Sequence, residues 1–384
     1  MANNDKVKIG KAKGRPMLTW VGKRPLTSAK AYPAQHIETF SAAEDDISNA
    51  LADVDWSDWP DAYPKGGLLF HGDNKDVLAH LLANGFRGKV KLIYIDPPFD
   101  SGADYVRKVQ LRGVSGTTKI DGEEYTLGEQ IQYEDIWAND NYLQFMYERL
   151  LMLKELLSEH GSIYLHCDVN KSHHLRSLMD EVFGSERFRN EIVWQRVAAR
   201  SDSNTYNHIH DTIFFYTKGD GFTWNAQYEE HDEEYLEDKY SNVDEDGRRY
   251  QLDNITSPNP RPNMKYVWMG HEPPDKGWRY SKETMQKLHD EGRIWYPDDK
   301  SKRPRLKRYL DENRGRPVRS IWTDINPVNS QAADRLGYPT QKPIELVKRI
   351  ILSSSSEKDY VLDCFQGSGT VPYAAQMLGR RWIG

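Results

Sequence analysis

Two short stretches of the sequence combine residue types that could act on a ligand. The first, Asp96-Pro97-Pro98-Phe99, follows a β-rich apolar run at 90–95. The prolines fix the backbone, so the carboxylate of Asp96 and the carbonyl of Pro97 are two acceptors in set directions beside the aromatic face of Phe99. Two acceptors directed at the exocyclic amine of a nucleobase draw its nitrogen toward tetrahedral geometry and free the lone pair for attack. The stretch favours group transfer to a planar amine, with a strand-capping turn as the alternative.

The second stretch runs from Asp363 through a glycine-rich turn to Thr370. Glycines let a ligand approach the backbone closely, and free N–H groups at a helix start favour an anionic group such as an amino-acid carboxylate. A nucleoside-type cofactor fits this arrangement. A dinucleotide site is disfavoured, because Pro372 stands where G-x-G-x-x-G has its third glycine.

The hydrophobic pattern around both stretches predicts an α/β sheet. A strand pattern at 67–71, an amphipathic stretch to Leu82 and the run at 90–95 form a strand–helix–strand unit with a connection suited to a right-handed parallel crossover. Asp96 then lies at the carboxyl end of a strand, where open α/β sheets bind ligands. Further helices are expected at 141–160, 339–352 and 371–378, and further strands at 163–166, 191–194, 212–216, 361–365 and 381–384.

The composition is that of a folded, polar-surfaced protein, with 38% hydrophobic and 29% charged residues in a chain of 384. Two cysteines are too few for a disulfide framework or a cysteine metal site. No apolar run has the length of a membrane helix and the start of the chain lacks a signal peptide pattern, so we expect a cytoplasmic protein without a membrane partner.

Charge is unevenly distributed along the chain. The net charge of −6 argues against an all-over basic surface, but residues 1–30 hold eight Lys or Arg against one acid, and residues 301–319 hold eight against two. The second basic run interleaves with Tyr309, Trp322 and two prolines, a mixture expected where phosphates are met and bases stacked. We therefore expect its cluster to contact DNA phosphates, through Arg303, Arg305, Lys307 and Arg308.

The same patterns divide the chain into four parts. Residues 1–65 are expected to be a basic N-terminal arm with little regular structure, because alternating strand and helix signals begin only at Gly66. The alternation dissolves over 221–320 into acidic, Pro-rich and aromatic sequence, which predicts an inserted domain between the sheet halves 66–220 and 321–384.

With D-P-P-F upstream of F-x-G-x-G-T, the sequence resembles the beta-class DNA amino-methyltransferases, the N4/N6 DNA methylase family, over Leu68 to Gly384. Within the family it looks like the modification subunits of type III restriction systems. The resemblance implies a seven-stranded, Rossmann-like methyltransferase sheet, circularly permuted in motif order, with 221–320 as a target-recognition domain. It also implies site-specific methyl transfer from S-adenosyl-L-methionine to the N6 amine of adenine in double-stranded DNA.

The resemblance assigns roles residue by residue. Asp96, Pro97, Pro98 and Phe99 would clamp the target amine and stack its base. His210 and Asp211 head a motif that fronts the base, with a structural role for the histidine equally open; Thr340 and Asp73 keep a helix N-cap and a turn as alternatives. The residues implied to line the cofactor are Asp73, Thr340, Gln341, Lys342, Asp363, Phe365, Gly367, Gly369 and Thr370.

Two departures from the family pattern affect these expectations. Cys364 stands where the family usually has proline, which should change packing only. After Arg381-Trp382-Ile383-Gly384 the family continues to an acidic residue that holds the cofactor ribose, so we expect either a fragment or weakened cofactor binding.

Three rival functions stay open at this point. Cytosine N4 methylation uses the same clamp, although D-P-P-F favours adenine, and a catalytically silent DNA-binding specificity subunit is the second rival. The third is a nucleotide-linked oxidoreductase, which the missing third glycine disfavours. The recognition sequence, a restriction subunit as partner and a homodimer are left open by the sequence.

Overall fold

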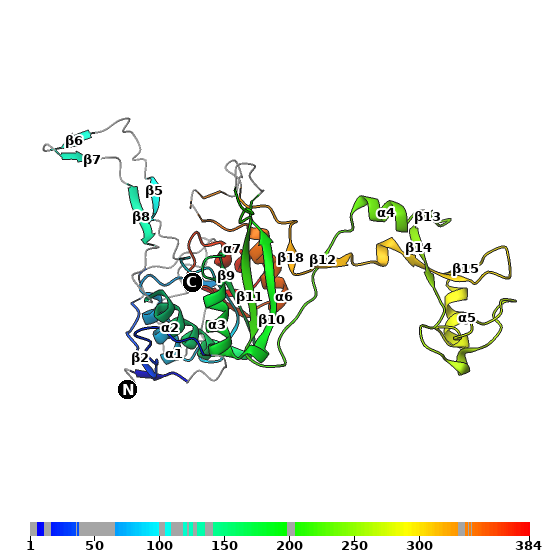
Figure 1. The fold of residues 1–384 in the computed structure, drawn as a ribbon, viewed down its shortest axis with the longest axis horizontal. Helices are drawn as coiled ribbons and strands as arrows, with labels where there is room; N and C mark the ends of the chain where they lie inside the picture. The colour runs from blue at the N-terminus through cyan, green and yellow to red at the C-terminus, as the bar shows by residue number, and fades with distance from the viewer. Residues whose placement is uncertain are drawn as a thin grey trace, which may run out of the picture. The chain divides into compact units, whose positions relative to one another are not determined.

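The computed structural model describes residues 6–10, 17–35, 37, 66–99, 104–108, 118–120, 123–125, 129–134, 141–197, 204–328, 335–336, 338 and 340–384. The chain divides into two compact units (Figure 1). The first comprises 1–225 and 319–384, and the second comprises 226–318. The second unit falls inside the segment 221–320, where the sequence predicts an insertion.

The first unit is built on a mixed sheet with the strand order β18-β10-β11-β9-β4-β19-β20-β3. β11 runs antiparallel to β9 and β10, and the other pairs are parallel. The strands are β3 (Gly67–Leu68), β4 (Val90–Ile95), β9 (Leu157–Cys167), β10 (Phe188–Gln195), β11 (His210–Thr217), β18 (Ile321–Trp322), β19 (Tyr360–Leu362) and β20 (Arg381–Ile383).

This sheet has eight strands in the described residues, where the sequence predicts seven. The edge strand β18 forms where the chain re-enters the first unit at residue 319, and it pairs with β10 over only two residues. The amide of Val193 donates to the carbonyl of Ser320 at 2.8 Å, which extends the pairing by one bond. So short a strand carries no periodicity that could predict it.

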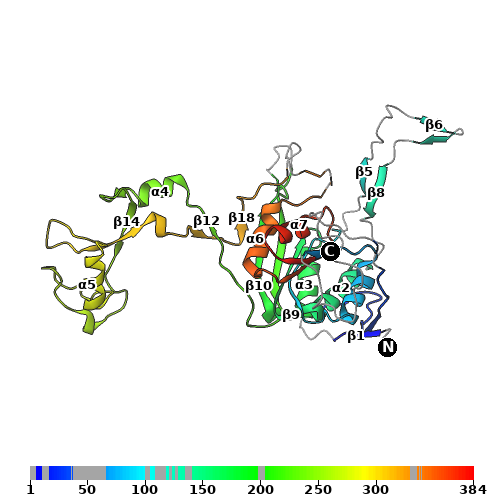
Figure 2. The same ribbon diagram turned by 180° about the vertical axis from the view of Figure 1, so that it is seen from behind.

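Helices cover both faces of the sheet (Figures 1 and 2). α1 (Asn74–Ala83), α2 (Asn141–Leu156) and α3 (Ser172–Phe183) lie on one face, and α6 (Ile344–Ser354) and α7 (Thr370–Met377) lie on the other. α2 buries Met146, Leu150 and Leu153 fully, because their spacing puts them on one helical face. The edge formed by the carboxyl ends of β4, β19 and β20 is left for the candidate site.

Some boundaries differ from the sequence expectation. The helix expected over 141–160 ends at Leu156, because Leu157 already pairs with Val90 in the sheet. The strand expected over 361–365 ends at Leu362, since the carboxylate of Asp363 accepts the amide of Phe365 at 2.9 Å and turns the chain. The helix expected from residue 339 begins at Ile344, after Pro343.

The described part of the N-terminal arm is attached to the core of the first unit. β1 (Lys6–Lys8) and β2 (Ser28–Lys30) pair antiparallel, and both contribute to the core of the first unit. Trp20 is buried, and the ammonium of Lys23 pairs with Glu181 at 2.7 Å. Regular structure in these residues is limited to the two short strands, as expected, but single apolar side chains between charged ones attach the arm to the core. The rest of the arm lies outside the described residues.

Further paired strands precede α2. β5 (Asp104–Lys108) pairs with β8 (Glu129–Glu134), and β6 (Thr118–Ile120) pairs with β7 (Glu123–Tyr125). In the part of the chain that the structure describes, no helix is long and apolar enough to cross a membrane.

The second unit has its own sheet and core. Its four strands are ordered β13-β14-β16-β15, and Trp268, Trp278, Met285 and Leu306 are buried together beside them. A separate core is what an inserted domain needs to fold. The elements are β12 (Tyr228–Glu229) paired with β17 (Arg316–Pro317), α4 (Glu233–Lys239), β13 (Asn242–Val243), β14 (Arg249–Asn254), α5 (Lys282–Asp290), β15 (Ile294–Trp295) and β16 (Arg305–Tyr309), with short 3-10 turns at Pro262–Met264 and Leu310–Glu312 here and at Ser185–Arg187 in the first unit.

Candidate functional site

Asp96 follows the carboxyl end of β4, between β9 and β19 in the sheet. Its Oδ2 is paired with the ammonium of Lys342, which also lies 5.3 Å from the ring centroid of Phe99. Its Oδ1 is buried and has no hydrogen-bond partner among the described residues. An orphaned carboxylate oxygen in a partly buried site is costly unless a ligand donates to it. The structure thus brings Asp96, Phe99 and Lys342 together.

A buried polar network lies behind Phe99. The imidazole of His166 on β9 is tilted by 34° against the Phe99 ring, with centroids 6.2 Å apart. Its Nδ1 is 2.8 Å from the hydroxyl of Tyr94, and its Nε2 is 3.1 Å from Oδ2 of Asp211. The indole of Trp194 meets the imidazole edge to face at 5.8 Å. Packing and hydrogen bonds therefore fix the imidazole below the aromatic side chain of the motif.

Asp211 points into this network, not to the surface. Burial raises the pKa of its carboxyl, but the hydrogen bond with His166 and the charges of His166, Arg196 and Lys342 outweigh burial and hold the pKa below its usual value. Arg196 lies 3.2 Å from Oδ1 of Asp211. The sequence left a hydrogen-bonded structural role open for His210. In the structure the histidine with such a role is His166, which pairs with Asp211, and His210 is half-buried at the start of β11.

The glycine turn between β19 and α7 supplies an open backbone. Gly369 is the N-cap of α7 with a φ of 80°, and Gly367 has a φ of 51°, conformations that glycine adopts without steric cost. A Cβ on Gly369 would meet no described atom within 4 Å. Asp363 is buried at the start of the turn, and burial raises its pKa to about 8, although the amide of Phe365 and the charge of Lys342 oppose the shift. Its neutral form predominates at neutral pH.

A cleft opens beside this turn at the carboxyl ends of β3, β19 and β20. Its lining includes Phe70, Gly72, Asn74, Cys364 and Gly384. The amide of Phe70 donates to the carbonyl of Gly384 at 2.8 Å, so the residues that follow β20 and the edge strand β3 are joined at its rim. Cys364 is half-buried, and burial raises the pKa of its thiol, which suits a packing residue.

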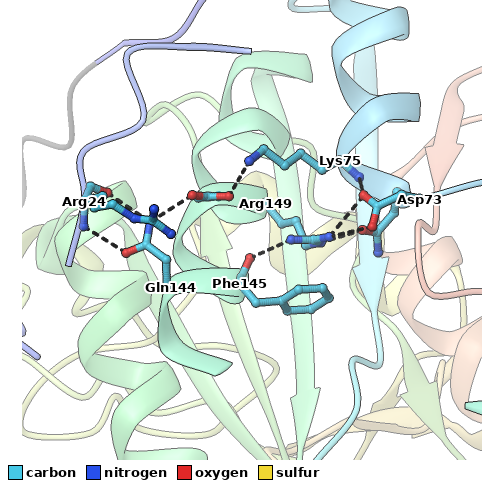
Figure 3. A network of polar contacts seen from close by, with 8 residues as sticks. Arg24, Asp73, Lys75, Gln144, Phe145 and Arg149 are labelled. Atoms are coloured by element: carbon cyan, nitrogen blue, oxygen red, sulfur yellow. Dashed lines mark hydrogen bonds and ion pairs between the residues drawn. The ribbon is translucent and has the colours of Figure 1, made fainter. Parts of the chain in front are cut away.

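Asp73 is fixed at this cleft by an arginine that the sequence analysis missed (Figure 3). Arg149 on α2 is buried, with Nη2 3.2 Å from Oδ1 of Asp73 and Nε donating to Oδ1 of Asn74. Its guanidinium lies 3.4 Å from the ring centroid of Phe145. Asp73 also caps α1 by accepting the amide of Lys75 at 2.8 Å. The structural alternative expected for Asp73 is a turn, and the structure shows a helix N-cap instead. The sequence did carry a signal for Arg149, because it stands among apolar positions of a helix. An arginine that is buried there must be paired with an acceptor.

The 340–342 segment packs against the glycine turn. The hydroxyl of Thr370 donates to the carbonyl of Lys342 at 3.4 Å, and the side-chain oxygen of Gln341 accepts the amide of Leu336 at 2.8 Å. The N-cap alternative for Thr340 is wrong, because α6 begins at Ile344 with Pro343 before it. The two segments expected to line the cofactor are therefore neighbours, and Lys342 extends from them to Asp96.

The four basic residues expected to contact phosphates lie on or just before β16 in the second unit, where they differ in availability. Lys307 pairs with Asp244 at 2.8 Å, and Arg308 pairs with Asp253 at 2.6 Å. Arg303 and Arg305 are exposed, and within the described residues neither forms an ion pair. The described residues also contain no cluster of three or more His, Cys, Asp or Glu side chains suited to a metal ion.

Comparison with known proteins gives the family. The type II methyltransferase M.EcaI of Enterobacter cloacae is 32% identical over 315 residues, 81% of this chain and 64% of that protein. The StyLTI Mod subunit, from a type III restriction-modification enzyme of Salmonella typhimurium, is 27% identical over 367 residues, 88% of this chain and 54% of that protein. The chain thus spans between about half and two thirds of the length of these relatives.

The crystal structure of the M1.HpyAVI-SAM complex has a TM-score of 0.40 and 15% identity, covering 83% of this chain and 91% of that one. So distant a likeness supports no assignment of residues. The DNA methylase family model for N6 and N4 enzymes matches residues 90–384, which include both motifs and the whole second unit. The chain therefore belongs to the N6/N4 DNA methylase family.

Proposed function

We propose that this chain is the catalytic part of a DNA methyltransferase that uses S-adenosyl-L-methionine to methylate the N6 amine of adenine in double-stranded DNA. The observation that carries the proposal is Asp96, whose buried Oδ1 has no donor among the described residues while Phe99 lies at the same strand end. Family membership and the relatives' names support methylation of DNA, and the D-P-P-F motif favours adenine over cytosine.

Each residue of the motif has a distinct task in this proposal. The target base must leave the duplex to reach the strand end, at a cost of a few kcal/mol. Phe99 then stacks on the base, while the carboxylate of Asp96 and the carbonyl of Pro97 accept the two amine hydrogens. Pro98 keeps both acceptors in place by restricting the backbone. With the cofactor bound, the amine lone pair would attack the methyl carbon; the N–C bond would form as the S–C bond breaks, S-adenosylhomocysteine would leave, and one amine proton would pass by way of the Asp96 carboxylate to solvent.

The cofactor residues fit a nucleoside that carries an amino-acid tail. Gly369 leaves open space at the start of α7, where backbone N–H groups favour a carboxylate. We place the nucleoside beside the cleft at Asn74 and Gly384, next to which Asp73 lies in the chain. When bound, S-adenosyl-L-methionine supplies an electrophilic methyl group. The chain's contribution is positioning, since an aligned donor and acceptor remove much of the barrier. The other proposed cofactor residues are Thr340, Gln341, Lys342, Asp363, Phe365, Gly367 and Thr370.

We assign target recognition to residues 221–320, because the sheet and its two motifs serve any target alike. The sheet is interpreted as seven methyltransferase strands in permuted motif order, with β18 as an addition. The relatives that are Mod subunits support a restriction subunit as partner, while a homodimer stays open.

The test is to incubate the chain with DNA and labelled S-adenosyl-L-methionine, digest the DNA and identify the methylated nucleoside. N6-methyladenine is the expected product. N4-methylcytosine would correct the target base but keep the reaction, and no labelled nucleoside would contradict the proposal. Asp96→Ala is the control: it should abolish transfer, because it removes the side-chain acceptor of the amine, while calorimetry still shows cofactor binding.

A further inference from the structure

The side chain of Lys342 makes the two contacts that the target base would need. Its ammonium is paired with Oδ2 of Asp96 and lies 5.3 Å from the centroid of the Phe99 ring. The proposed base would donate an amine hydrogen to the same carboxylate and stack on the same ring. Oδ1 of Asp96 stays open to the amine, so Lys342 and a bound base share the carboxylate but compete for the Phe99 ring.

The ion pair is well shielded, so its loss has a cost. The side chains of Lys342 and Asp96 keep only 10% and 17% of their exposure. Breaking a shielded pair leaves an uncompensated charge unless a new donor replaces the old one. The amine of adenine would donate to the open Oδ1 of Asp96 but is neutral, so part of this cost remains when the base enters.

The backbone of Lys342 is held while its side chain can move. The carbonyl of Lys342 accepts the hydroxyl of Thr370, and Pro343 and α6 follow directly. The ammonium, in contrast, ends a flexible four-carbon stem, so it can withdraw without displacing the cofactor segments.

We propose that Lys342 competes with the target base for the Phe99 ring, its ammonium being held there by Asp96 until the base displaces it from the ring. This inference rests on the proposed function. It also gives the return of Lys342 a role in product release, because a methylated amine keeps one N–H where the substrate had two. The product base therefore holds the clamp less firmly than the substrate base did.

The test is a thermodynamic cycle of equilibrium binding. Wild type and Lys342→Met are each titrated with a duplex that carries the target adenine and with the same duplex made abasic at that position. Lys342→Met keeps an unbranched side chain, one atom shorter, and removes its charge. The affinity for the adenine duplex divided by that for the abasic duplex should be about threefold or more higher in Lys342→Met than in wild type. A factor of this size corresponds to the free energy of a partly shielded ion pair. A general loss of attraction to phosphates affects both duplexes alike and cancels.

Two variants control for charge and folding. Lys348→Met removes an ammonium that pairs with Glu345 on α6, at 3.0 Å and away from the motif, and should leave the ratio unchanged. Lys342→Arg keeps a cation for Asp96 and should hold the ratio near that of wild type. An equal change on both duplexes in Lys342→Met, or a rise of the ratio in Lys342→Arg as large as that in Lys342→Met, overturns the role of Lys342.

The duplex is chosen from sites that wild type methylates in the labelling assay, so the two proposals fail separately. If wild type methylates no DNA, the proposed function fails. If wild type methylates the duplex and the cycle shows no coupling, only the role of Lys342 fails. A steady-state rate that falls in Lys342→Met while its single-turnover rate holds would further support the role in product release.

Discussion

Nε2 of His166 lies 3.1 Å from Oδ2 of Asp211, and both side chains are buried in the central sheet. His166 pairs in register with Ile213 on β11, and Asp211 lies two residues earlier, so the two side chains share one face of the sheet. Tyr94 on β4 completes the contact across three neighbouring strands. Phe99 packs against His166 of this network. Disrupting the network should therefore affect both the stability of the fold and the geometry of the site.

Replacing His166 by alanine should lower the free energy of unfolding by about 3 to 5 kcal/mol, because it leaves the buried carboxylate of Asp211 without its main donor. The double variant with Asp211→Asn should lose less than the sum of the single changes, since it removes the unpaired charge. Urea unfolding of the four proteins checks this. Additive losses would mean that the pair has no mutual energy.

The same pair has a pH dependence of known sign. The pKa of Asp211 is below its usual value of 3.8 in the folded chain, so the folded state binds this proton less tightly than the unfolded state. The stability from the carboxylate is therefore full above about pH 4 and is lost as the pH falls through the lowered pKa. The gap in unfolding free energy between wild type and Asp211→Asn should narrow on acidification below pH 4. A constant gap would contradict the lowered pKa.

Phe99→Ala should slow methyl transfer by removing the stacking surface for the base, a loss of about 1 to 3 kcal/mol by analogy with single-stranded DNA binding. Phe99→Tyr keeps the ring and should be mild. Single-turnover rates on DNA with an unpaired target base isolate stacking from the opening of the duplex. Equal rates for wild type and Phe99→Ala on that substrate would remove the stacking role.

Asp363 predicts the opposite pH trend. Burial raises its pKa from 3.8 to about 8, so between these values the folded state holds a proton that the unfolded state has released. The stability contributed by the neutral carboxyl is therefore full below the lower value and falls as the pH rises toward the upper one. Asp363→Asn removes this titration, so wild type should lose thermal stability relative to the variant between about pH 4 and pH 8. If the melting temperatures of wild type and Asp363→Asn changed equally with pH across that range, Asp363 would be charged throughout it.

The local features of the site could be predicted from the sequence. The strand Val90–Ile95 is confirmed at both ends, because a short apolar run that ends at a proline pair is compatible with few structures other than a buried strand. The glycine turn into α7 is confirmed to within one residue, since Gly367 and Gly369 take the positive φ values that only glycine adopts freely.

The contacts that complete the site could not be predicted, because they join residues far apart in the chain. Lys342 and Asp96 are 246 positions apart, and the sequence motif of Lys342 suggested the cofactor as its neighbour, with no sign of the carboxylate. Arg149 looked like one charged residue in an amphipathic helix, and only packing shows that it is buried against Asp73. The buried side chains of the arm escaped notice because single apolar residues between lysines carry no period.

The basic residues of β16 should separate into two classes when each is replaced by alanine. Arg305 is exposed and free of ion pairs within the described residues, so its loss should weaken binding to all DNA similarly and lower the slope of log affinity against log salt by about one. Lys307 is held by Asp244, with which Tyr309 also forms a hydrogen bond, so its loss should instead destabilise the second unit and change the salt slope little. Binding titrations at several salt concentrations, with unfolding curves of the same variants, distinguish the two effects. If Lys307→Ala lowers the slope as much as Arg305→Ala while the unfolding curve is unchanged, then the ion pair with Asp244 opens on DNA and Lys307 contacts phosphate as Arg305 does.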